Sequence, residues 1–339
     1  MKKYIGIDAG TRTSNICVIS AEKKVLKELV VSNKLIGKEI KDISGLKHCI
    51  IEAGPLSEYI CEQIELVAGA TIDIVDSRHT KALLQGRKKT DKIDCRILAE
   101  LAALGWYKPV YRKGADARTQ KVIVKGRGSL VKSSVQIKNT IRGLLKAYGV
   151  VLPLTSEGSR FLEKAKDSIA DLEDDVKLII TDLLEVWNEA YTRQRKSYVR
   201  ITKLTNNNEI TRKLMTVPGV GPATALSFVA TVVNPRRFSD GKQLAGYLGL
   251  APKVYQSGDT HFHGRITKQG DKSARWHLVE SAHIILTRVK DDFPLRSWGL
   301  KLAEKKGFAK AKVAVARRLA IMLHAIWLND SEFELPLAA

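Results

Sequence analysis

The first hundred residues constrain the fold most, because β-rich runs alternate there with helical patterns across residues 3–104. This alternation predicts an α/β domain with at least one crossover connection. The predicted strands cover residues 4–8, 15–20, 25–32, 48–52 and 71–75, and the predicted helices cover residues 56–67 and 91–104. An opening of three strands and a helix, followed by strands alternating with helices, matches an RNase H-like fold.

Four acidic residues fall where this architecture would bring them together. Asp8 ends the first predicted strand, Glu52 ends the fourth, and Asp91 and Asp94 lie three residues apart in one predicted helix. Strand ends of an open α/β sheet converge on a common crevice, and residues three apart share a helix face. Clustered carboxylates need cations, and Mg²⁺ prefers oxygen ligands. The sequence therefore predicts a magnesium site suited to phosphoryl transfer.

The opening Gly6-Ile7-Asp8-Ala9-Gly10-Thr11 admits a second interpretation. Actin-like ATPases and sugar kinases begin with a similar strand, aspartate and glycine turn that holds a nucleotide phosphate. Those folds also need a second phosphate loop and a glycine-rich adenosine motif, and the chain offers no convincing candidate for either. We therefore prefer the carboxylate interpretation.

The charge of the chain indicates its partner. A protein with a formal net charge of +21 most often binds a polyanion. Nucleic acid is therefore the leading partner, and a membrane surface is the alternative. No apolar run is long enough to span a bilayer, and we expect a cytoplasmic, nucleoid-associated prokaryotic protein. The four cysteines form no Cys-x-x-Cys pair and are expected to be buried, while His261 and His263 are expected to be loop histidines rather than metal ligands.

Residues 108–146 carry eleven basic side chains against a single acid, Asp116. A stretch whose charges are almost all positive favours a surface that contacts the phosphates of a nucleic acid backbone. The alternative is a pair of helices whose charges only make them soluble. The residues expected to contact nucleic acid here are Lys121, Lys125, Arg127, Lys132, Lys138 and Arg142.

Apolar residues then repeat at alternating steps of three and four from Leu162 to Ala190. Such spacing predicts a heptad seam that is buried against another helix. The pattern itself favours neither an intermolecular coiled coil nor an intramolecular hairpin. The polar cluster Thr205-Asn206-Asn207-Asn208 that follows is a predicted domain boundary.

Two glycine-containing segments stand out in the last third of the chain. The turn around Gly219 and Gly221 is typical of a helix-hairpin-helix element, whose amides face phosphates, with a plain structural hairpin as the alternative. Further on, Ser257 precedes a glycine in a predicted polar loop, where Arg265 and Lys268 could balance charge on a phosphorane. Chemistry alone does not single out Ser257, because Tyr247 and Tyr255 are equally nucleophilic in principle.

Taken together, Asp8, Glu52 and the Thr90-Asp91-Lys92-Ile93-Asp94 run resemble the DEDD motif of insertion-sequence transposases related to the Piv DNA invertase, some of which are RNA-guided bridge recombinases. Residues 215–275 resemble the C-terminal transposase domain of that family. The resemblance implies a RuvC-like first domain, a coiled-coil connector and a serine nucleophile, which corresponds to Ser257. After the arginine that follows the lysine-glycine segment the family usually has an apolar residue, where this chain has Arg275-Trp276-His277. Trp276 is expected in the core, with stacking on a base as the alternative.

These observations predict a RuvC-like domain with a basic helical extension over residues 1–150, a coiled-coil connector over 151–205, and a mostly α transposase domain over 206–339. The resemblance implies magnesium-dependent cleavage and rejoining of double-stranded DNA through a phosphoserine, by a dimer or tetramer directed by a structured guide RNA. Two alternatives stay open: a RuvC-like nuclease of branched DNA without a covalent step, and a non-catalytic nucleic-acid-binding protein.

Overall fold

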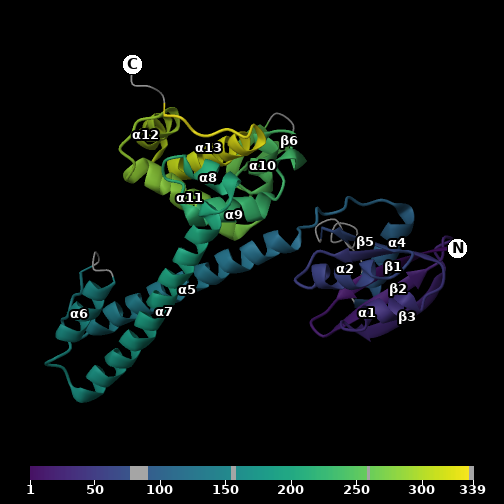
Figure 1. The fold of residues 1–339 in the computed structure, drawn as a ribbon, viewed down its shortest axis with the longest axis horizontal. Coiled ribbons are helices and arrows are strands. Elements are labelled where there is room, and N and C mark those ends of the chain that lie inside the picture. Colours follow the sequence, from purple (N-terminus) through teal and green to yellow (C-terminus); the bar gives the residue numbers. More distant parts are fainter. Residues whose placement is uncertain (77–90, 154–157, 258–259, 336–339) are drawn as a thin grey trace. The chain divides into compact units, whose positions relative to one another are not determined.

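The computed structural model describes residues 1–76, 91–153, 158–257 and 260–335 (Figure 1). For Asp91, Lys92 and some residues of the short β-hairpin near Ser257 it describes the backbone and not the side chain. The chain divides into two compact units, Met1–Lys113 and Gly114–Ala339. Each unit is described by itself. The predicted limits at residues 150 and 205 stay predictions.

The first unit is built on a five-stranded sheet in the order β3-β2-β1-β4-β5. Strands β1, β2 and β3 pair antiparallel, and β1, β4 and β5 pair parallel, which requires crossover connections. Each strand overlaps one predicted from the sequence, so the predicted α/β character is confirmed. The strands are β1 (Lys2–Ala9), β2 (Thr13–Ile19), β3 (Val25–Ser32), β4 (Leu46–Glu52) and β5 (Ala70–Val75).

Helices cover both faces of this sheet. On one face, Ile5 and Ile7 of β1 pack with helices α1 (Ile36–Lys41) and α2 (Ser57–Glu65). On the other face, helix α4 (Asp91–Leu104) packs on residues that alternate with these, such as Ile50. Helix α1 was missed by the sequence interpretation, because six residues are too few to establish a 3.6-residue period.

Glycine at position 6 sets the closeness of α4 to the sheet. A Cβ atom at Gly6 would lie 1.9 Å from the carbonyl oxygen of Cys95 and 2.5 Å from the amide nitrogen of Ala99. No other residue type allows the helix backbone to approach the strand this closely. The contact therefore positions the first turns of α4 over the strand that carries Asp8.

A long helical hairpin opens the second unit. Helices α5 (Ala115–Lys146) and α7 (Asp174–Asn206) lie side by side, as Figure 1 shows, and α6 (Ser159–Asp167) packs near one end. Ile141 of α5, Phe161 of α6 and Trp187 of α7 share one buried cluster. Val124 of α5, Ile201 of α7 and Leu226 of α9 form a second, smaller cluster.

This arrangement corrects the prediction of one continuous heptad seam. The apolar repeat from Leu162 to Ala190 runs over two helices, because α6 ends at Asp167 and α7 begins at Asp174. Part of the seam, including Ala165, Val176 and Leu183, packs inside the unit. Ile179 and Val186 are exposed. Pairing between α5 and α7 favours the intramolecular hairpin for the buried part of the seam.

The remainder of the second unit is mostly helical, as predicted, around a large apolar core that includes Phe228 of α9 and Leu278 of α11. Its elements are α8 (Glu209–Met215), α9 (Pro222–Val232), a 3-10 turn (Pro235–Arg237), α10 (Gly241–Tyr247), β6 (Pro252–Ser257), β7 (Thr260–Ile266), α11 (Lys272–Thr287), α12 (Pro294–Lys306) and α13 (Phe308–Leu328).

Two further expectations from the sequence can be compared with the structure. Cys17, Cys49, Cys61 and Cys95 are all buried and unbridged, which confirms their interpretation as small apolar residues. Among the helices in the described ranges, none has the length and apolar character that crossing a membrane requires.

Candidate functional site

Asp8 and Glu52 are neighbours at the carboxyl ends of two adjacent parallel strands. The last parallel pair between β1 and β4 joins Ile7 to Ile51, and Asp8 and Glu52 each follow by one residue. Strand residues alternate between faces, so both positions share the face of Ile50, which packs against α4. Both side chains are half-buried. The predicted proximity of these strand ends therefore agrees with the register of the sheet.

Helix α4 brings Asp94 to the same face. Cys95, the next residue, lies over Gly6. The pKa of the Cys95 thiol is raised by its hydrogen bond with Cys17, then by burial, and further by nearby negative charges that include Asp8. Asp8 is therefore within electrostatic reach of the first turns of α4. Asp91 is the first residue of the helix and lies three positions before Asp94, but its side chain falls outside the described residues.

Asp94 also provides a test of whether a cation fits here. Its Oδ1 atom is buried and has no hydrogen-bond partner among the described residues. A buried carboxylate oxygen without a partner is costly, and a metal ion relieves that cost. The donor set of Asp8, Glu52 and Asp94 consists of carboxylates, which Mg²⁺ prefers. These features fit a divalent cation.

Among the side chains that the structure describes, no three acidic, histidine or cysteine groups converge closely enough to hold a metal ion. Asp91 and residues 77–90 are outside that comparison. The ligand set Asp8, Glu52, Asp91 and Asp94 consequently stays a prediction.

In the second unit, Ser257 is the last residue of β6 and pairs with Thr260 of β7. It therefore belongs to a strand of a short hairpin and not to the polar loop expected from the sequence. Its side chain lies outside the described residues, as do those of His261 and His263. Arg265 on β7 and Lys268 just after it are both exposed to solvent.

The loop after this hairpin is held in place by Arg275. Its Nη1 atom donates to the carbonyl oxygens of Leu248, at 3.0 Å, and Gln269, at 2.8 Å. Arg275 thus has a structural role, and the departure from the family pattern lies in the residues that follow it. The expected core position of Trp276 is wrong, because 48% of its surface is exposed.

A partly buried polar cluster connects the basic helix α5 to α11. The Nζ atom of Lys121 donates to Asp271 Oδ2 at 2.7 Å, and Asp271 also accepts from the backbone amides of Ser273 and Ala274 at the start of α11. Burial alone would raise the pKa of Asp271, but the bond from Lys121, the amide of Ala274 and the charges of Lys121 and Lys125 lower it to about 2. The cluster was missed from the sequence, although an aspartate before Lys-Ser-Ala is a helix N-cap signal.

Arg127 and His277 extend this cluster. Burial lowers the pKa of Arg127, whose guanidinium lies 5.1 Å from the ring centre of Tyr198 on α7. The pKa of His277 is lowered to about 4, first by burial and then by the positive charge of Arg127, while Asp271 opposes the shift. Neither Arg127 Nε nor His277 Nε2 has a hydrogen-bond partner among the described residues.

The basic residues of α5 therefore divide into two groups. Lys121 and Arg127 are engaged inside the unit, and Lys138 and Arg142 lie over the ring of Phe161 at 4.8 and 5.5 Å. Lys125 and Lys132 are exposed. The predicted contact of all six with nucleic acid stays a prediction, and the exposed pair presents its charge to solvent most directly.

In the turn between α8 and α9, Gly219 packs against helix α11. Gly219 has a φ of +87°, and a Cβ there would lie 2.7 Å from Ile285 Cγ1 of α11. Gly221, the residue before α9, has no atom of the described residues within 4 Å of its Cβ position. Packing thus explains Gly219, and the predicted phosphate contact of this turn stays a prediction.

Comparison with known proteins links both units to one group of enzymes. A model of DEDD transposases of the IS110 type matches residues 5–150, and a model described as the transposase IS116/IS110/IS902 family matches residues 211–296. The transposase for insertion sequence element IS1111A of Coxiella burnetii is 26% identical over 98% of this chain and 91% of its own length.

Two further relatives support the same group. A probable family 20 transposase of Pseudomonas aeruginosa is 23% identical over 96% of this chain and 97% of its own. The pilin gene-inverting protein of Moraxella bovis is 27% identical over 47% of this chain and 50% of its own. With both family models matched in order along one chain, the protein belongs to the IS110/IS116 family of DEDD transposases, enzymes that cleave DNA and transfer its strands.

Proposed function

We propose that this transposase cleaves and rejoins double-stranded DNA through a covalent phosphoserine at Ser257, together with a magnesium site formed by Asp8, Glu52, Asp91 and Asp94. The phosphoserine step rests on the place of Ser257 within residues 211–296, which match the transposase family model. The observation that carries the magnesium site is the register of the first sheet. It makes Asp8 and Glu52 neighbours on the face covered by α4, where Asp94 Oδ1 is buried and no described residue offers it a hydrogen bond.

The proposed fold of the first unit is RNase H-like, of the RuvC type. Its support is the order β3-β2-β1-β4-β5, with three antiparallel strands followed by two parallel ones and with helices on both faces. We propose that in this arrangement the strand ends and the first turns of α4 form one acidic face. Magnesium, when bound, would offset the negative charge that develops on a reacting phosphate.

The residues of the chain divide the chemistry between them. The carboxylates hold the cation site, and the Ser257 hydroxyl attacks a DNA phosphate while losing its proton to a base or solvent. A bond forms between serine oxygen and phosphorus as the bond to one DNA oxygen breaks, and that oxygen leaves as a hydroxyl. Arg265 and Lys268, both exposed near the hairpin, would stabilise the added negative charge. Because the phosphoester is conserved, the reverse step rejoins a strand.

A guide RNA and an oligomer complete the proposal. The net charge of +21 and the exposed Lys125 and Lys132 suit a second polyanion beside the DNA.

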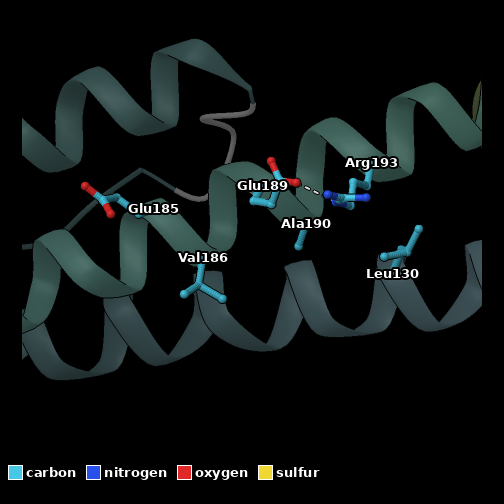
Figure 2. A pocket seen from close by; sticks show the side chains of 6 residues that line it. All are labelled: Leu130, Glu185, Val186, Glu189, Ala190 and Arg193. Carbon is cyan, nitrogen blue, oxygen red and sulfur yellow. Dashed lines mark hydrogen bonds and ion pairs between the residues drawn. The ribbon is translucent and has the colours of Figure 1, made fainter.

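Oligomer contact is proposed along the α5–α7 hairpin. A shallow groove of about 460 Å³ lies there, lined by Leu130, Val186, Ala190 and charged neighbours. Figure 2 shows Val186 and Ala190 directed toward the facing helix that carries Leu130, with Glu189 and Arg193 paired beside them. The two parts of the active site are proposed to come from different subunits.

Trapping a protein–DNA adduct tests the covalent step. Labelled substrate DNA, incubated with the protein and Mg²⁺ and then denatured, should migrate with the wild-type chain and not with Ser257→Ala. Tyr255→Phe, Tyr247→Phe and Thr260→Val should still form the adduct. An adduct that persists in Ser257→Ala and disappears in a tyrosine variant would assign the nucleophile to that tyrosine.

The same experiment distinguishes the phosphoserine mechanism from a second candidate function, a RuvC-like nuclease that uses water to cut branched DNA. The strand order of the first unit favours this candidate independently of Ser257, because an acidic face of this kind needs no partner from the second unit. Metal-dependent cleavage without any adduct, unchanged in Ser257→Ala, would establish the nuclease and exclude the phosphoserine.

A further inference from the structure

The β6–β7 hairpin carries an aromatic pair that the proposed chemistry does not use. Tyr255 and Phe262 are register partners across the two strands. Their rings are stacked, with centroids 4.7 Å apart and planes 10° from parallel. The exposed fractions are 47% for Tyr255 and 54% for Phe262. Two large rings therefore stand in solvent on one face of the hairpin.

Neither ring is part of the apolar core of the second unit, although Tyr247 and Ile266 pack against that core nearby. A cross-strand aromatic pair stabilises a hairpin, but that role does not require so much of each ring to remain exposed. The ring of Tyr255 leans over Gly264, where a Cβ would lie 2.8 Å from its Cε2 atom. One face of Phe262 is occupied by Tyr255, and its exposure leaves room for a further flat group.

The surroundings indicate the chemistry of that group. Lys253 on β6, Arg265 on β7 and Lys268 just beyond are exposed on the same short segment. Flat rings combined with cations are the features that hold a single nucleic acid strand, because bases stack on aromatic faces while phosphates meet positive charge. The formal net charge of +21 favours a polyanion as the molecule that supplies the flat group.

The position of Tyr255 on β6, close to Ser257, indicates what the aromatic pair could do. Ser257 lies two residues beyond Tyr255, a separation of about 7 Å in a strand and the spacing at which positions share one face. We propose that Tyr255 and Phe262 form a stacking platform for one unpaired nucleobase of the DNA substrate. The platform then holds the base next to the phosphate that Ser257 attacks, a role that rests on the proposed function.

Binding of a fluorescent base tests the platform without any chemistry. The probe is a single-stranded DNA oligonucleotide of mixed sequence that contains 2-aminopurine, whose fluorescence falls when it stacks on an aromatic ring. The protein is the full chain with Ser257→Ala, so that no covalent step occurs. We expect fluorescence to fall on binding, and Phe262→Leu or Tyr255→Leu to weaken binding at least about fivefold and to remove most of the decrease.

Matched variants separate stacking from hairpin stability. Tyr255→Phe keeps a flat ring and should bind and quench as the parent does, and Phe262→Trp should quench at least as strongly. Trp106→Leu removes a side chain of the first unit that is 70% exposed and should change nothing. Equal affinity and equal quenching in Phe262→Leu would overturn the proposal, as would a loss in Phe262→Trp as large as that in Phe262→Leu. An RNA oligonucleotide of the same sequence that depended more strongly on Phe262 would overturn DNA as the occupant.

The experiments test the stacking platform and the phosphoserine mechanism separately. If the platform is wrong and the mechanism correct, Phe262→Leu will bind the probe normally while Ser257→Ala alone loses the covalent adduct. If the mechanism is wrong and the platform correct, quenching will depend on Phe262 although no serine adduct forms.

Discussion

A methyl group on Gly6 would lie 1.9 Å from the carbonyl oxygen of Cys95, so helix α4 rests directly on strand β1 beside Asp8. The contact involves helix backbone and cannot be relieved by a side-chain rotation. The position of Asp94 relative to Asp8 and Glu52 consequently depends on a residue that has no chemical role of its own.

Gly6→Ala should displace α4 and lower the free energy of unfolding by at least about 2 kcal/mol, with loss of DNA cleavage. Chemical denaturation and a cleavage assay would measure both effects. Gly143→Ala is the matched control, because its Cβ position in exposed α5 has nothing within 4 Å. That control should stabilise the protein by about 0.5–1 kcal/mol. A Gly6→Ala protein as stable and active as wild type would show that α4 does not need this close contact.

Asp94→Asn should abolish metal-dependent activity while leaving the fold intact, because it removes a charge without changing the shape of the side chain. Thermal unfolding with and without Mg²⁺ gives a readout independent of catalysis. The melting temperature of the wild type should rise with Mg²⁺ concentration, and that rise should be lost in Asp94→Asn and kept in Asp42→Asn, an exposed control. An equal rise in all three proteins would remove Asp94 from the ligand set.

Ile179 and Val186 lie seven residues apart on α7 and are 53% and 57% exposed. If this face joins subunits, Ile179→Asp with Val186→Asp should reduce both the oligomer mass and the recombination activity, since charges would replace apolar contacts. Light scattering measures the mass. Leu66→Asp, at an 88% exposed position of the first unit, should leave both unchanged. An unchanged mass in the double variant would assign the apolar repeat to the intramolecular hairpin alone.

The ion pair between Lys121 and Asp271 should contribute to stability in a defined pH range. The folded-state pKa of Asp271, about 2, lies below its ordinary 3.8, so the contribution is present above pH 3.8 and is lost as the pH falls toward 2. At neutral pH the shift corresponds to roughly 2 kcal/mol, which Lys121 shares with the amide of Ala274 and the charge of Lys125.

Asp271→Asn keeps the helix cap, removes the charge and should lose about that much at pH 7 in urea denaturation. Asp240→Asn changes an exposed cap of α10 and should cost far less. Equal losses in the two variants would indicate that a negative charge at the helix N-terminus, and not the ion pair with Lys121, stabilises α11.

His277 should make the second unit sensitive to mild acid. Its pKa is about 4 in the folded protein against an ordinary 6.5, so the unfolded chain takes up a proton first as the pH falls. No penalty exists above pH 6.5, and it grows to about 3 kcal/mol as the pH approaches 4. His277→Gln should flatten this part of the pH profile measured by denaturation. The same slope between pH 6.5 and 4 in the variant would point to another group.

The predicted strands agree with the structure to within a few residues, and the basic helix and the mostly helical last third also follow from local patterns. Asp8, Glu52 and Asp94 could be selected because strand ends and helix spacing are local properties. The short helix α1 and the interruption between α6 and α7 were missed, since a repeat in sequence does not reveal where the backbone turns.

By itself, the sequence determined which residues can form an acidic strand end, a cationic helix and a serine next to a glycine, because these depend on residue type and spacing. Only the tertiary structure decided that Gly6 admits α4 against β1, that Lys121 and Arg127 are engaged inside the second unit, and that Tyr255 stacks on Phe262 in solvent. Burial and pairing join residues that are distant along the chain, as with Lys121 and Asp271, and no local pattern specifies such a partner.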